Sequence, residues 1–146
     1  MSRILVDTSA LLALLDGDDP RQDAVRSAFA EHPDDDLVTH GYVIAESLAV
    51  AGRRLGIDGV VSLLDDVLPA ISVLPVDSAT HATAQTRHRA ALPSGVSFVD
   101  QVSFVVIERE GIDMALVLDS DFVRPGLTVI PSPGAGTLDL PNSTQT

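Results

Sequence analysis

The sequence predicts a single α/β domain around a central, mostly parallel sheet of four to five strands. Short apolar stretches typical of buried strands alternate along the chain with longer segments of helical periodicity. With 146 residues, 45% of them hydrophobic, the chain is long enough to bury one core. Ligands of a parallel sheet gather at the carboxyl ends of its strands, so acids at those ends are the first candidates for a site.

The N-terminal part predicts a strand followed by two helices. Residues 4–6 are a short apolar run, and Asp7 leads from them into a helix over residues 10–15. Pro20, which suits a first helical turn, opens a second helix over residues 20–31.

The middle of the chain predicts a strand and two further helices. Residues 37–39 form the strand, and apolar residues then recur at helical spacing over residues 43–55. Gly56 ends that helix. The next helix covers residues 57–68 and stops before Pro69.

The last part repeats the alternation. A strand over residues 71–76 precedes two helices, at residues 78–91 and 97–110. Residues 115–118 form a fourth strand and residues 127–130 a short fifth.

The domain is expected to span residues 1–131. Residues 132–146 are rich in Pro, Gly, Ser and Thr and predict a disordered tail. Asp7 interrupts the apolar N-terminus, and no run approaches the ~18 apolar residues of a membrane span, so a soluble protein without a signal peptide or membrane contact is expected. The absence of Cys excludes disulfides and thiolate zinc sites and is compatible with the cytoplasm.

The charge restricts the function further. The net charge is −12, and all nine basic residues are Arg, which excludes mechanisms that need a lysine. Such a chain is not expected to adhere non-specifically to nucleic acid. A nucleic-acid substrate would depend on metal ions and a few local Arg. The basic clusters are Arg53-Arg54 and Arg87-His88-Arg89, which also fit solvated helix ends.

Acids next to apolar segments are the main candidates for a site: Asp7, Glu46, Asp100 and Asp119. An ionised acid in such surroundings is costly unless a positive group neutralises it, and basic residues are scarce in this chain. A hard divalent cation, Mg²⁺ or Mn²⁺, takes oxygen ligands from distant segments and retains several waters.

Each acid also has a structural explanation. Asp7 can cap the following helix, and Asp100 completes a capping box with the Ser three residues before it. Glu46 can pair with an Arg, and Asp119 and Asp121 can be turn residues. Taken together these explanations weaken, because the acids fall on elements that converge at one edge of the sheet.

Four motifs in order, ILVDTSALLALLD, VIAESLAVAGRRLG, SFVDQVSFVVIEREGI and ALVLDSDF, resemble a PIN domain. The similarity runs from Arg3 to about Ile130 and is closest to VapC-like toxins of bacterial toxin–antitoxin pairs. It implies a three-layer α/β/α fold and a metal-dependent endoribonuclease. It also implies an RNA substrate, a small antitoxin protein as partner, and a homodimer formed through helices, for which residues 43–55 and 57–68 are candidates.

The resemblance also implies roles for single residues. The family's acidic quartet around Mg²⁺ or Mn²⁺ is matched by Asp7, Glu46, Asp100 and Asp119. Asp121 matches a variably acidic position, and Thr8 or Ser9 matches a small hydroxyl residue that orients the first Asp or touches the phosphate.

The implied reaction is attack on phosphorus by a metal-activated water. It needs neither the ribose 2′-OH nor a histidine pair, so none of the four His, His32, His40, His81 and His88, is expected to be catalytic. Four Phe and one Tyr leave little material for base stacking, which favours recognition of RNA shape and of a short exposed loop.

Two alternatives remain open at this stage. A phosphatase of the haloacid dehalogenase type also begins with a strand ending in Asp, but Ser9 stands where its second Asp belongs and its Lys is missing. The other is a non-catalytic PIN-like interaction module, which the four acids argue against.

Overall fold

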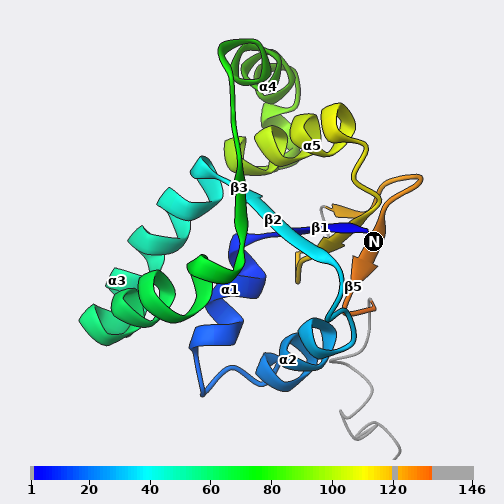
Figure 1. Cartoon of the computed structure of the whole chain (residues 1–146). Coiled ribbons are helices and arrows are strands. Elements are labelled where there is room, and N and C mark those ends of the chain that lie inside the picture. The colour runs from blue at the N-terminus through cyan, green and yellow to red at the C-terminus, as the bar shows by residue number, and fades with distance from the viewer. Residues whose placement is uncertain (1, 120–121, 133–146) are drawn as a thin grey trace, which may run out of the picture.

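The computed structural model describes residues 2–119 and 122–132 (Figure 1). Within them, five strands form one sheet in the order β3-β2-β1-β4-β5, and every neighbouring pair is parallel. The strands are β1 (Arg3–Val6), β2 (Asp36–His40), β3 (Ser72–Leu74), β4 (Met114–Leu116) and β5 (Thr128–Ile130). The expectation of a parallel sheet is confirmed.

Helices cover both faces of the sheet. They are α1 (Thr8–Leu15), α2 (Gln22–Ala30), α3 (Gly41–Ser62), α4 (Ser78–Ala90) and α5 (Phe98–Glu110). Because side chains alternate along a strand, Ile4 and Val6 of β1 pack with α1, α2 and α3, whereas Leu5 packs on the opposite face with α4 and α5. The fold is therefore the three-layer α/β/α arrangement. No helix among the described residues has the length and apolarity that a membrane crossing requires.

The strand order places a switch point beside β1. From β1 the chain moves outward to β2 and β3, and then returns across β1 to add β4 and β5 on the other side. Connections at such a point diverge to opposite faces and leave a crevice at the carboxyl ends of β1 and β4. Asp7 follows β1 directly, and Asp119 follows β4.

The two helices expected at residues 43–55 and 57–68 are joined in α3. Gly56 has φ 73° and ψ −164°, which are not helical values, so the chain kinks between two helical parts that share the label α3. The expectation that Gly56 ends the first of them is therefore confirmed. Regular helix stops at Ser62, and a π-helical turn (Leu63–Val67) and a 3₁₀ turn (Leu68–Ala70) follow. Helical turns therefore continue to Ala70, two residues beyond the expected end at residue 68, because Pro69 is tolerated in the first turn of the 3₁₀ segment.

Two strands are shorter than expected, one at the edge of the sheet and one inside it. The strand predicted over residues 71–76 is only Ser72–Leu74, since this edge strand pairs with β2 alone. The strand predicted over residues 115–118 is Met114–Leu116, although the Val117 N–H still donates to the Ile130 carbonyl at 3.0 Å. The predicted tail, residues 132–146, lies outside the described residues except for its first residue.

Candidate active site

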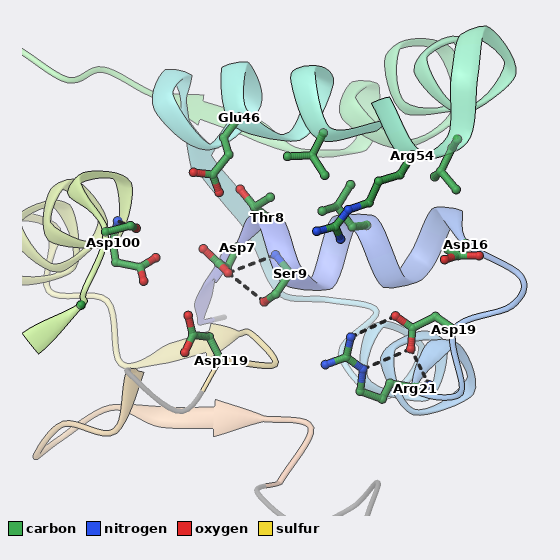
Figure 2. A pocket seen from close by; sticks show the side chains of 15 residues that line it. Asp7, Thr8, Ser9, Asp16, Asp19, Arg21, Glu46, Arg54, Asp100 and Asp119 are labelled. Carbon is green, nitrogen blue, oxygen red and sulfur yellow. Dashed lines mark hydrogen bonds and ion pairs between the residues drawn. The ribbon is translucent and has the colours of Figure 1, made fainter. Parts of the chain in front are cut away.

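A pocket of about 370 Å³ opens at the carboxyl ends of β1 and β4 (Figure 2). Its lining includes the four acids singled out by the sequence, each from a different segment: Asp7, Glu46, Asp100 and Asp119. Asp7 lies at the junction of β1 and α1, Glu46 on α3, and Asp100 in the first turn of α5. The structure thus brings to one cavity acids that lie up to 112 positions apart in the sequence, from 7 to 119.

Asp7 is buried, with 4% of its surface exposed, and it caps α1. Its Oδ2 accepts the Ser9 N–H at 3.1 Å and the Ser9 hydroxyl at 2.8 Å. Burial raises the pKa of Asp7; the hydrogen bonds from Ser9 oppose this, and the negative charge of Glu46 adds to it. Asp7 therefore serves as a helix cap and also carries a costly negative charge into the pocket.

The Ser9 hydroxyl joins two acid-bearing segments. It donates to Asp7 Oδ2 and accepts the backbone N–H of Leu118 at 2.9 Å. Leu118 immediately precedes Asp119, so one hydroxyl fixes the carboxylate after β1 relative to the segment after β4. Of the two hydroxyl residues suggested by the sequence, Ser9 is the one that contacts Asp7 in this way.

The Thr8 hydroxyl contacts α3 instead. It donates to the Val43 carbonyl at 3.5 Å and accepts from the Ser47 hydroxyl at 3.2 Å, and both Thr8 and Ser47 are buried. Ser47 is the neighbour of Glu46 in α3. Thr8 thereby holds the helix that carries Glu46 against the start of α1.

Asp100 lies at the N-terminus of α5 and is 7% exposed. Its backbone N–H donates to the Ser97 hydroxyl at 3.1 Å, as the predicted capping box requires. A carboxylate here is also stabilised by the positive end of the helix dipole. Capping therefore fixes the position of Asp100 at the pocket, and the two explanations of this residue are compatible.

Asp119 is half-buried at the rim of the pocket, beyond the end of β4. Its side chain is drawn beside that of Asp7 in Figure 2. Asp121, the fifth acid suggested by the sequence, lies outside the described residues.

The far end of the pocket carries two Arg that the sequence did not assign to a site. Arg21 is bound by Asp19 through two side-chain hydrogen bonds, at 3.1 and 3.0 Å. Arg54 extends from α3 toward α1 and is exposed, and it makes no ion pair with any described residue (Figure 2). The Arg53-Arg54 pair was the only sequence signal for this cation.

The donor set suits a hard divalent cation. All four acids offer oxygen ligands, and the like charges of Asp7 and Glu46 are close enough to affect the pKa of Asp7. Within residues 2–119 and 122–132, however, no three Asp, Glu or His side chains are grouped tightly enough to enclose an ion by themselves.

Comparison with known proteins agrees with this architecture. The model of the PIN domain family matches residues 4–126. The 23S rRNA-specific endonuclease VapC20 of Mycobacterium tuberculosis (strain H37Rv) is 29% identical over 133 residues, covering 87% of this chain and 97% of VapC20.

Solved structures give the same result. The crystal structure of M. tuberculosis VapC20, described as a sarcin–ricin loop cleaving toxin, has a TM-score of 0.75 at 28% identity and covers 82% of this chain and 92% of its own. VapBC2 from Rickettsia felis, bound to a DNA fragment from its promoter, has a TM-score of 0.67 at 12% identity over 87% and 96% of the two chains, and it supports the fold alone.

These matches confirm the resemblance seen in the four motifs, including its VapC-like character. The haloacid dehalogenase alternative is not retained, because the family match covers most of the chain. By sequence and by fold, this chain belongs to the PIN domain family.

Proposed function

We propose that this protein is a metal-dependent endoribonuclease of the VapC type, acting as the toxin of a toxin–antitoxin pair in the cytoplasm. The observation that carries the proposal is the pocket at the switch point, where carboxylates from four separate segments line one cavity. The burial of Asp7, which raises the pKa of its carboxyl, supports the same proposal, because perturbed carboxylates concentrate at functional sites.

In this proposal Asp7, Glu46, Asp100 and Asp119 hold Mg²⁺ or Mn²⁺. The bound ion would supply a water of lowered pKa and neutralise charge on the phosphate. Ser9 keeps Asp7 oriented toward the pocket through its 2.8 Å hydrogen bond. Asp121, next to the pocket-lining segment in sequence, is retained as an additional candidate ligand.

Arg54 is proposed to contact the phosphate of a neighbouring nucleotide. It lines the same pocket as the four acids and has no ion pair with a described residue. In a chain with a net charge of −12, a local cation is needed to hold a polyanion in register.

The relatives suggest the substrate and the partners. VapC20 is named as specific for 23S rRNA and as cleaving the sarcin–ricin loop, so a structured RNA of this kind is the proposed substrate. VapBC proteins are among the similar structures, which supports a small antitoxin as partner. A homodimer completes the proposal.

Cleavage of an RNA hairpin with the sarcin–ricin loop sequence tests this function. The wild type should cut it with Mg²⁺ or Mn²⁺ and not with EDTA. Asp100→Asn is nearly isosteric and keeps the backbone cap, so it should reduce cleavage at least a hundredfold with little change in melting temperature. Asp34→Asn, an exposed acid away from the pocket, is the matched control and should remain active. Full activity of Asp100→Asn would remove Asp100 from the site.

Expression in bacteria tests the toxin role separately. The wild-type chain alone should arrest growth, Asp7→Asn should be harmless, and co-expression of the small protein encoded beside it should restore growth. If the wild-type chain did not arrest growth when expressed at the same level, the toxin role would be contradicted, even if RNA cleavage were observed in vitro.

A further inference from the structure

A second pocket, of about 350 Å³, lies where α4 meets the segment that leads into α5. It is lined by Gln85, His88, Arg89, Leu92 and Phe98. Its volume lies within the range of small-molecule sites, about 300–1,000 Å³. None of these residues lines the acidic pocket.

Two of the five residues that line this second pocket carry rings, His88 and Phe98. The rings of His88 and Phe98 meet edge to face, with centroids 5.7 Å apart. The centroid of the Phe98 ring also lies 5.4 Å from that of His81 and 5.9 Å from that of Tyr42. Two of the five Phe and Tyr residues of the chain, Phe98 and Tyr42, thus lie together with two His rings. The expectation that Phe and Tyr leave little material for base stacking did not foresee this cluster.

The pocket also contains unused polar groups. His88 Nδ1 is buried and has no hydrogen-bond partner among the described residues. A buried polar atom without a partner costs free energy, which a ligand that pairs with it would recover. Gln85 and Arg89 are exposed at the rim. Arg87 pairs with Glu108 at 2.7 Å. Arg89, in contrast, makes no ion pair within the described part of the chain.

The two pockets are neighbours. Ser97 lines the acidic pocket and Phe98 lines the second one, and consecutive Cα atoms are only about 3.8 Å apart. The segment from Leu92 to Asp100 therefore separates a site suited to a phosphodiester from an aromatic cavity.

We propose that the second pocket receives an unpaired nucleobase of the RNA substrate, splayed out near the cleaved bond. The rings offer a stacking surface, His88 Nδ1 and the Gln85 amide can pair with the edge of a base, and Arg89 can contact the adjacent phosphate. The identification of this base as part of an RNA rests on the proposed function. The ability of the pocket to bind a base does not rest on it, because base binding can be tested without cleavage.

Titration of adenosine and cytidine into the ¹³C,¹⁵N-labelled full-length chain without divalent metal is the test. Nucleosides carry no phosphate, so neither metal nor Arg54 draws them to the acidic pocket. The side-chain signals of His88 and Phe98 should shift and saturate. Phe98→Leu, which keeps apolar volume but removes the ring, should weaken binding about tenfold or more, while Phe98→Tyr should retain it.

Gln85→Ala and Arg89→Ala address the exposed rim and remain informative if Phe98→Leu does not fold. Gln85→Ala should weaken nucleoside binding, because the amide pairs with the base. Arg89→Ala, which removes the phosphate contact, should leave nucleoside binding unchanged and raise the KM for the RNA hairpin without lowering kcat. Arg26→Ala, exposed on α2, should do neither. The proposal is overturned if the nucleosides cause no saturable shift at His88 and Phe98, or if the shifts centre on residues of the acidic pocket. Either outcome leaves the cleavage activity standing.

Discussion

The Nε2 atom of His40 lies 2.8 Å from the hydroxyl oxygen of Ser103, and neither residue is exposed. The other ring nitrogen, Nδ1, accepts the first backbone N–H groups of α3 and so caps that helix. Since Nδ1 is an acceptor, Nε2 carries the proton and donates it to the Ser103 hydroxyl. His40 thereby connects α3, which carries Glu46, to α5, which carries Asp100.

This contact predicts that the protein loses stability in mild acid. Burial, with a smaller effect of the Arg109 charge, lowers the pKa of His40 from 6.5 to about 4. Between these values the unfolded chain binds a proton that the folded chain does not, so the free energy of unfolding falls as pH decreases through this window. The loss of stability caused by His40 is roughly 3 kcal/mol, and it is complete once the pH lies below the pKa of His40 in the folded protein.

His40→Asn tests this effect, because Asn keeps a capping acceptor and does not titrate. Urea unfolding followed from neutral pH down to the pKa of His40 should show a shallower loss of stability in the variant. If the free energy of unfolding fell equally with pH in the two proteins, the assignment of this effect to His40 would be contradicted.

Ser9→Ala should lower the rate of RNA cleavage about tenfold. It should also shift the acidic limb of the pH profile of cleavage to higher pH. The hydrogen bond from the Ser9 hydroxyl lowers the pKa of Asp7, so its loss must raise that pKa, whereas the backbone N–H of residue 9 still donates to Asp7. The Leu118 N–H also loses its acceptor, at a cost of about 1–3 kcal/mol. The measurement is the pH dependence of kcat alongside urea unfolding. Ser27→Ala, exposed on α2, should leave both unchanged.

Asp7→Asn should alter the response to metal more than it alters the fold. Because burial raises the pKa of Asp7, the ionised side chain opposes folding at neutral pH, and the neutral amide, itself a good cap, should raise the melting temperature of the metal-free protein. Added Mn²⁺ should then stabilise the wild type more than the variant, by mass action on the folded state. Equal Mn²⁺ shifts in both proteins would place the ion elsewhere.

An apolar face after the bend at Gly56 is the expected homodimer contact. Ile57, Val61 and Leu64 are 81%, 46% and 47% exposed and recur at helical spacing. Val61→Glu should lower the molecular mass measured by light scattering from that of a dimer to that of a monomer. It should not lower the melting temperature. Val123→Glu, at an exposed position in another part of the chain, is the control. A wild-type monomer at high concentration would contradict the prediction.

Much of the fold was predictable because its signals are local. Apolar runs, Pro20, Ser97 and the glycines indicated the type and order of the elements, since capping and burial depend on neighbours a few residues away. The acids at Asp7 and Asp100 were recognisable for the same reason. Strand ends were not, because a strand extends only as far as its partner offers hydrogen bonds.

The sequence by itself thus determined the elements, the four acids and the family. Only the tertiary structure decided that β4 returns beside β1, which places Asp119 near Asp7 and lets Ser9 join their segments. It alone paired His40 with Ser103 and gathered the rings around Phe98. The physical reason is that such contacts join residues far apart in the chain and form only when packing of the whole core brings their elements together.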